Sequence, residues 1–246
     1  MAHSDFRTPR LYVADDLHPG DILALGRNAA NYLRNVLRLD HGAPVQVFNG
    51  RDGEWRGRLD LPSKRETRLV VDEQTRPQPA ASDLHYAFAP LKHARLDFMM
   101  QKAVEMGADR LSPVMTARTQ VARVNLDRIR ANAMEAAEQC GILSLPEIEE
   151  PIRFPQWLAG VADERVIVFC DEEAEASDPF AALAGAPVGA LTLLVGPEGG
   201  FAEEERRALL ARPKVVRLSL GPRILRADTA AVAALALLQA ARGDWR

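Results

Sequence analysis

The segment LLVGPEGGFAEEE, residues 193–205, has the composition of a ligand-binding loop. An apolar run ends in three glycines and a proline, so a ligand could approach the backbone closely and use its amide N–H groups. The spacing fits neither the dinucleotide fingerprint G-x-G-x-x-G nor a P-loop, which needs a lysine before serine or threonine. Glutamates at 203–205 fill the first helical turn, where a phosphate would bind, and so argue against phosphate. A tight strand-to-helix turn that merely requires glycine is the alternative.

A second segment, LSLGPRILRADT at residues 218–229, repeats this arrangement. Gly221-Pro222 ends an apolar run, as Gly196-Pro197 does, and Arg223 and Arg226 follow before a helix of small residues. Two such exits from strands of one sheet would place both loops at the same edge. We expect a cleft lined by backbone amides and carbonyls, suited to a neutral or cationic ligand with a purine ring.

Strands and helices alternate from residue 84 onward, which predicts a mostly parallel sheet covered by helices. Predicted strands lie at residues 84–89, 111–115, 165–171, 190–196 and 215–220, and predicted helices at 94–107, 125–140, 202–211 and 229–242. The runs RVIVFC and LTLLV are continuously apolar, as expected for central strands with both faces covered. Asn125 is predicted to cap one helix, and Gly107 and Gly141 to end two helices in the left-handed conformation.

The first 76 residues have a different pattern of short apolar runs separated by turn signals. This spacing predicts a small β-barrel, with one helix over residues 31–39 inserted in it. The proline-rich piece at residues 77–82 is typical of an interdomain linker. We therefore expect two domains, 1–76 and 83–246.

Composition limits the class of protein. The 246 residues are 47% hydrophobic and 26% charged, which is typical of a folded globular protein. Cys140 and Cys170 have no spacing that would bind zinc, so free thiols and no metal are expected. The N-terminus lacks a signal-peptide core and no apolar stretch is long enough to cross a bilayer, so the expected location is the cytoplasm, without membrane contact.

The net charge of -3 hides an uneven distribution. Residues 206–226 contain seven basic residues and no acid, and residues 110–130 contain five arginines against one acid. Residues 147–178 contain ten acids against two arginines. The two basic tracts could bind phosphates while the acidic stretch faces away from them, or all three could be solvated helix faces.

The chain resembles the ribosomal RNA small subunit methyltransferase E family, in the SPOUT superfamily. The motifs that carry the resemblance are YLRNVLRLDHG at 32–42, QKAVEMGADRLSPV at 101–114, AAEQCG at 136–141, GPEGGF at 196–201 and LSLGPRILRADTA at 218–230. The resemblance implies an α/β fold, with a PUA-like RNA-binding β-barrel and a SPOUT-type parallel sheet that has helices on both faces and a deep trefoil knot. It also implies S-adenosylmethionine (SAM) as methyl donor, a homodimer, and methylation of N3 of a uridine in 16S ribosomal RNA or the small subunit, with no DNA partner.

The resemblance also assigns roles to residues. The implied cofactor-binding residues are Leu194, Gly196, Pro197, Glu198, Gly199, Gly200, Leu218, Ser219, Leu220, Gly221, Ile224 and Leu225. Arg226 is the candidate catalytic cation, because methylation of N3 develops negative charge on the uracil carbonyls. Glu198 is either a general base or a residue that fixes its loop. Arg10, Arg34 and Arg38 of the barrel, together with Arg223, are candidate RNA-binding cations, with surface solvation as the alternative.

Two departures from the family pattern are small. Ala202 stands where a serine or threonine cap is expected, which weakens the start of the following helix, and Asp228 stands where glutamate is common. Two rival functions stay open: a nonenzymatic RNA-binding protein that has lost SAM, and a related SPOUT methyltransferase that acts on tRNA or on another ribosomal position.

Overall fold

The computed structural model describes residues 7–63, 65–92, 94–174 and 178–245. The chain divides into two compact units. The first comprises the described part of Met1–Ala80 together with Ala137–Leu145, and the second comprises Ala81–Ala136 and Pro146–Arg246. Residues 77–83 between the last strand of the first unit and the first strand of the second form no regular element. The predicted boundaries of the two domains stay a prediction.

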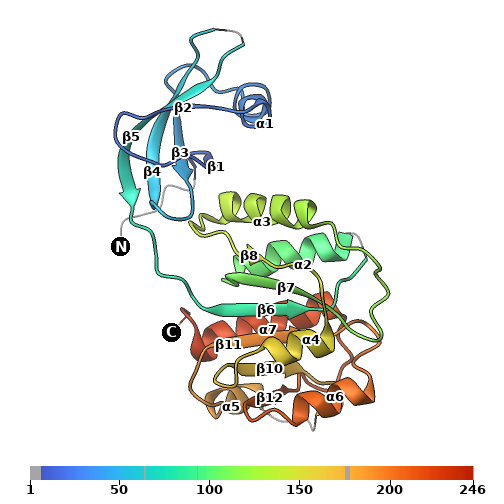
Figure 1. Cartoon of the computed structure of the whole chain (residues 1–246). Helices are drawn as coiled ribbons and strands as arrows, with labels where there is room; N and C mark the ends of the chain where they lie inside the picture. Colours follow the sequence, from blue (N-terminus) through green and yellow to red (C-terminus); the bar gives the residue numbers. More distant parts are fainter. Residues whose placement is uncertain (1–6, 64, 93, 175–177, 246) are drawn as a thin grey trace. The chain divides into compact units, whose positions relative to one another are not determined.

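The first unit contains a curled five-stranded sheet in the order β1-β3-β4-β5-β2 (Figure 1). Its strands are β1 Arg10–Tyr12, β2 Ile22–Ala24, β3 Pro44–Phe48, β4 Glu54–Asp60 and β5 Arg68–Arg76. Strand β1 pairs with β3 in parallel, and the other pairs are antiparallel. Alternate positions of β3, β4 and β5, such as Val47, Leu59 and Leu69, point into one buried core.

The helix predicted over residues 31–39 is shifted and changes type. An α-helix, α1 Arg27–Asn31, is followed directly by a π-helix, η1 Tyr32–Val36. The wider turn is closed by the Leu37 amide, which donates to the Tyr32 carbonyl at 2.9 Å. A regular helix would place Leu33 and Val36 on the same face, but Leu33 is fully buried while Val36 is 62% exposed. The helix ends where Arg38 adopts a positive φ of 55°.

The second unit contains a seven-stranded parallel sheet. The strands are β6 Leu84–Phe88, β7 Arg110–Met115, β8 Glu147–Ile148, β9 Ile152–Arg153, β10 Val166–Cys170, β11 Leu191–Val195 and β12 Val215–Leu218. Their order is β12-β10-β11-β6-β7-β8, with β9 also paired to β7. The two strands predicted to be central, β10 and β11, are interior strands, and this confirms the prediction.

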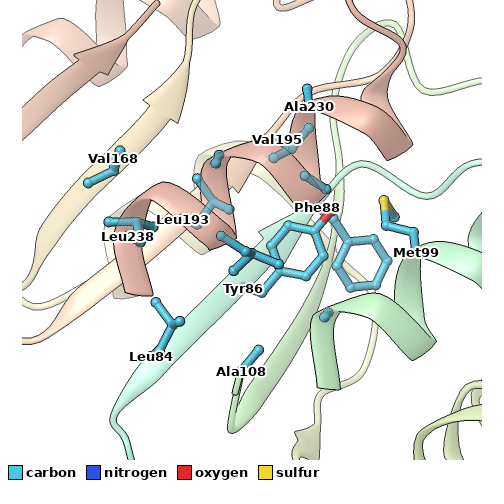
Figure 2. Packing of buried hydrophobic residues seen from close by; sticks show 14 of the residues in the cluster. Leu84, Tyr86, Phe88, Met99, Ala108, Val168, Leu193, Val195, Ala230 and Leu238 are labelled. Atoms are coloured by element: carbon cyan, nitrogen blue, oxygen red, sulfur yellow. The ribbon is translucent and has the colours of Figure 1, made fainter. Parts of the chain in front are cut away.

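Helices cover both faces of this sheet (Figure 1). One face packs against α2 Ala94–Glu105, the first part of α3 Leu126–Cys140, α5 Pro179–Ala184 and α7 Ala227–Arg242. The other face packs against α4 Phe154–Gly160 and α6 Glu203–Leu210. On the first face the stacked rings of Tyr86 and Phe88 lie 5.3 Å apart, in the core that also holds Met99 and Ala230 (Figure 2). An α/β sheet with two helical layers is therefore confirmed.

The predicted helix ends are also confirmed. Gly107 and Gly141 have positive φ angles of 79° and 67°, the left-handed conformation that ends a helix. The Asn125 side chain accepts a hydrogen bond from the Arg128 amide at 3.1 Å, so Asn125 caps α3. Cys140 is exposed and Cys170 is partly buried.

Candidate functional site

Three loops meet at the carboxyl edge of the sheet. Strand β10 lies between β11 and β12, and all three strands run parallel, so the loops that follow them must share one edge. They enclose a cavity of about 300 Å³. Its lining comprises the last residue of each strand and the loop that follows it, together with one residue of α6 and two of α7: residues 170–174, 195–198, 200, 201, 206, 218–225, 227 and 230.

Ten of the twelve predicted cofactor-binding residues line this cavity, and Leu194 and Gly199 do not. Leu194 is fully buried in the core on the opposite face of the sheet, with Phe169. Successive side chains of a strand point to opposite faces, so the neighbouring Val195, not Leu194, reaches the cavity. The Leu194 side chain therefore faces away from the cavity, and a role for Leu194 in cofactor binding stays a prediction.

The glycines of the first loop are sterically required. Gly200 has a positive φ of 68°, and a Cβ there would lie 2.8 Å from Glu172 Oε1. A Cβ at Gly196 would lie 3.0 Å from the Phe201 ring. Gly221 in the second loop has a φ of 91° with open space around it. At Gly196, Gly200 and Gly221 the backbone that borders the cavity therefore carries no side chain.

The loop after β10 supplies acids that the sequence did not predict for this site. Asp171, Glu172 and Glu173 line the cavity, although the acidic stretch was expected to face away from the basic tracts. That expectation is wrong for these residues, because β10 is central and its carboxyl end must lie at the ligand-binding edge. The continuous apolar run RVIVFC, followed directly by DEE, is the signal that could have identified them.

Asp171 neutralises part of the basic tract. Its carboxylate, only 6% exposed as a residue, accepts hydrogen bonds from Arg206 at 3.1 Å and Arg217 at 2.6 Å. Burial alone would raise the pKa of this carboxyl, but the hydrogen bonds from Arg206, Arg217 and the Glu173 amide, with the charge of Arg217, together outweigh burial and lower the pKa. The adjacent Cys170 has no such partner, and burial raises the pKa of its thiol to about 12. Cys170 lines the cavity, but a protonated thiol is a poor nucleophile, so we assign it no chemical role.

A buried glutamate fixes the glycine loop to the rest of the sheet. Glu205 accepts hydrogen bonds from the Ala117 amide at 2.7 Å and the Ala202 amide at 2.9 Å, and so joins the loop after β7 to the start of α6. Arg118, in the same β7 loop, donates to the Gly199 carbonyl at 2.6 Å. The bond from Ala202 is one half of a capping box, in which the N3 carboxylate accepts from the N-cap amide, whereas the Ala202 side chain has no acceptor for the amides of the first turn. Sequence reasoning treated Glu205 only as part of an acidic helix start.

The two candidate catalytic residues lie in different surroundings. Glu198 lines the cavity and forms an ion pair with Arg95 of α2 at 3.2 Å. Arg226 is exposed at the N-cap position of α7, next to cavity residues Leu225 and Ala227, but it is not itself part of the lining. Its side chain makes no capping hydrogen bond.

The structure separates the four candidate RNA-binding arginines. Arg10 is only 6% exposed and its Nε donates to Glu54 Oε2 at 2.7 Å, so the expectation of an exposed cation is wrong. Its partner Glu54 on β4 is equally buried, and the pairing of the two opposite charges explains the burial. Arg34 is half-buried and donates to Thr67 Oγ1 at 3.2 Å, while Arg38 is exposed. Arg223 is exposed and lines the cavity at the sheet edge.

Comparison with protein families now assigns the class. A family model for an RNA methyltransferase domain matches residues 78–239, and one for an RNA methyltransferase PUA domain matches residues 25–71. The parallel sheet with its edge cavity, preceded by a PUA domain, is thus that of an RNA methyltransferase.

Full-length relatives narrow the class to one family. The ribosomal RNA small subunit methyltransferase E of Synechocystis is 32% identical, over 94% of this chain and 77% of that protein. The protein of the same name from Rickettsia conorii is 28% identical, over 92% and 93%. A crystal structure of ribosomal RNA small subunit methyltransferase E from Neisseria gonorrhoeae, bound to S-adenosyl methionine, has a TM-score of 0.85 at 28% identity and covers 98% and 100% of the two chains. The chain belongs to the ribosomal RNA small subunit methyltransferase E family.

This membership confirms the resemblance found in the sequence and the expected fold class, while the trefoil knot stays a prediction. In the ranges that the structure covers, no helix has both the length and the apolar composition to span a bilayer. The same ranges hold no group of three or more histidine, cysteine or acidic side chains arranged to bind a metal ion.

Proposed function

We propose that this protein transfers a methyl group from SAM to N3 of a uridine in 16S ribosomal RNA. The observation that carries the proposal is the cavity between two glycine loops at the carboxyl edge of the sheet, in a chain of this family. The neighbour from Neisseria gonorrhoeae, with the same fold, is bound to S-adenosyl methionine.

The residues of the cavity fit SAM. Backbone amides and carbonyls of residues 196–200 and 218–221 would hold the adenine and methionine parts, and Ile224 and Leu225 provide apolar surface for a purine ring. Carboxylates at 171–173 and at Glu198 suit ribose hydroxyls, an ammonium group and a positive sulfonium. A ligand without phosphate also agrees with the acidic first turn of α6, which disfavours anions.

When bound, SAM supplies the methyl group, and the residues of this chain must prepare the uridine. The N3–H of uridine is a weak acid, and when its proton passes to solvent water, negative charge remains on N3 and the two flanking carbonyl oxygens. We assign stabilisation of this charge to the guanidinium of Arg226. The ion pair between Glu198 and Arg95 favours a role for Glu198 in fixing the loop rather than in accepting the proton.

The remaining parts of the proposal concern organisation. We place a PUA-like RNA-binding domain at residues 1–76, a linker at 77–82 and a knotted SPOUT methyltransferase domain at 83–246. We also propose a homodimer that acts in the cytoplasm on 16S ribosomal RNA or the small subunit, and not on DNA.

The decisive experiment uses 16S ribosomal RNA and small subunits from a strain that lacks the gene. Incubation with the purified protein and SAM is expected to produce 3-methyluridine at one position, detected by mass spectrometry of nuclease fragments. No methylation of either substrate, together with no calorimetric signal for SAM or its demethylated product, would favour the nonenzymatic rival. Methylation of tRNA instead would identify the enzymatic rival.

Glu205→Ala is expected to weaken SAM binding about tenfold, because it frees the glycine loop from the β7 loop and leaves two amide donors without their acceptor. Turnover at saturating SAM should change much less, since Glu205 does not contact the cavity. Calorimetry with SAM and steady-state kinetics measure the two effects separately.

The matched control is Glu204→Ala, which removes an 81% exposed carboxylate from the same helical turn. This variant should bind SAM as the wild type does, and Glu205→Gln should fall between the two because its amide keeps one acceptor oxygen. Equal SAM affinity for Glu205→Ala and Glu204→Ala would show that Glu205 does not position the loop.

A further inference from the structure

The first unit has a basic hollow that the proposed methyl transfer does not use. It lies beside α1 and η1, between Leu25, which follows β2, and Thr67, which precedes β5. Its volume is about 740 Å³, against about 300 Å³ for the cofactor cavity. Its polar lining includes Arg27, Arg34, Arg65, Asn28, Asn31 and Asn35. We call it the arginine–asparagine hollow.

The charge of this hollow is opposite to that of the whole chain. The residues that line it include three arginines and no aspartate or glutamate, in a protein whose net charge is -3. Three positive charges gathered in one concave surface whose lining contains no carboxylate attract an anion.

Ion pairing distinguishes these arginines from others in the same unit. On strand β4, Arg56 pairs with Glu73 and Arg58 with Asp72, both at 2.8 Å. Near the edge of the hollow, by contrast, no carboxylate of the described residues lies within ion-pair distance of Arg27 or Arg65. Their charges are thus available to a ligand from outside the chain.

The neutral side chains favour a nucleic-acid backbone over an acidic protein surface. The three asparagine amides can both donate and accept hydrogen bonds, and all three are exposed. Asn35 Nδ2 donates to Asn31 Oδ1 at 2.8 Å. A phosphodiester chain offers anionic oxygens to the guanidinium groups and ribose hydroxyls to the amides. Carboxylates alone would leave the amide oxygens of Asn28 and Asn35 unused.

We infer that the arginine–asparagine hollow binds the phosphodiester backbone of RNA, at nucleotides other than the one that is methylated. The inference rests on the proposed function for the identity of the RNA. It replaces the barrel residue Arg10 of the sequence prediction with Arg27 and Arg65, and it retains Arg34, whose bond to Thr67 orients it at the wall of the hollow.

The test measures binding of 16S ribosomal RNA to the full-length protein over a range of salt concentrations. Arg27→Gln/Arg65→Gln is expected to weaken binding roughly tenfold near physiological salt, because two phosphate contacts are lost. The slope of log affinity against log salt should become shallower by about 1.4 for a single-stranded site. SAM affinity should stay unchanged, and hydrogen exchange of peptides from β3, β4 and β5 should match the wild type, which shows that the first unit is folded.

The matched control, Arg56→Gln/Arg58→Gln, removes the same charge from paired arginines and should bind RNA within about twofold of the wild type. Arg27→Lys/Arg65→Lys should recover most of the affinity and the salt slope. Equal losses in the two glutamine variants would mean that only net charge matters, and the inference would fail. It would also fail if naked RNA bound normally and only assembled subunits bound weakly, because that result indicates an acidic protein partner.

The outcomes separate this inference from the proposed function. Loss of RNA affinity specific to Arg27→Gln/Arg65→Gln, without any methylated product from the wild type, would uphold the hollow and overturn the enzymatic proposal. Normal formation of 3-methyluridine by the wild type, with wild-type RNA affinity in Arg27→Gln/Arg65→Gln, would uphold the enzymatic proposal and overturn the inference about the hollow.

Discussion

Arg226→Ala is expected to lower the single-turnover rate of methyl transfer about 100-fold or more, the usual cost of removing a group that stabilises charge in the transition state. The guanidinium stands at the N-cap of α7, beside two residues that line the cavity. Its side chain makes no capping hydrogen bond, so alanine should not disturb the start of the helix. Rapid quenching with excess enzyme and saturating SAM measures the chemical step directly.

Arg223→Ala is the control, because it removes an exposed arginine from the same loop. This variant should weaken RNA binding and leave the single-turnover rate at saturating enzyme nearly unchanged. If Arg226→Ala reacts at the wild-type rate, the assignment of Arg226 to charge stabilisation is wrong.

Glu54→Ala is expected to lower the free energy of unfolding of the first unit by about 3–5 kcal/mol, the usual cost of removing one partner from a buried ion pair. Glu54 is only 2% exposed, and its carboxylate accepts hydrogen bonds from Arg10 at 2.7 Å and Arg76 at 2.8 Å. The substitution would leave Arg10 buried without its carboxylate. Hydrogen exchange of peptides from β3, β4 and β5 in the full-length chain measures the effect on this unit.

The effect of Glu54 should depend on pH in a defined direction. Burial alone would raise the pKa of its carboxyl, but hydrogen bonds from Arg76, Arg10 and Thr75 outweigh burial and lower the pKa. A carboxyl whose pKa is lower in the folded chain than in the unfolded chain stabilises the fold at a pH above its unfolded-state pKa. It loses this contribution as the pH falls through its folded-state pKa. The difference between wild type and Glu54→Ala should therefore be complete at pH 7 and shrink below about pH 4.

Glu73→Ala on β5 is the matched control, since Glu73 pairs with Arg56 at the surface. It should cost less than about 1 kcal/mol. A similar loss of stability in the two variants would show that the buried Arg10–Glu54–Arg76 cluster contributes no more than an exposed pair.

The regular parts of this fold could be predicted because several local signals agreed. Continuous apolar runs identified β10 and β11 as interior strands, and left-handed glycines ended two helices where predicted. The short helix α4 was not predicted, because Pro155 and Gly160 obscure its pattern and its buried residues, such as Phe154 and Trp157, are few. Strands β8 and β9 contain two residues each, too few to show alternation.

The site was predictable where it depends on backbone and not where it depends on distant side chains. The glycines and prolines of the two loops indicate an unusual backbone conformation by themselves, without reference to distant residues. The two loops could therefore be identified from the sequence. The contacts of Glu205 with Ala117, and of Asp171 with Arg206 and Arg217, join segments that are 35 to 88 residues apart. Arg10 likewise became buried because of Glu54, 44 residues away.

Successive side chains at the end of β11 point to opposite faces of the sheet, and this restricts where residues can be inserted or deleted in the chain. Leu194 packs on one face of the sheet and Val195 borders the cavity on the other, immediately before the glycine loop. Deleting or inserting one residue within Leu191–Val195 would exchange these two faces and shift the loop at the same time. Core and binding site would be lost together, so natural insertions should be excluded from β11 and accommodated in exposed segments such as the loop that follows α5.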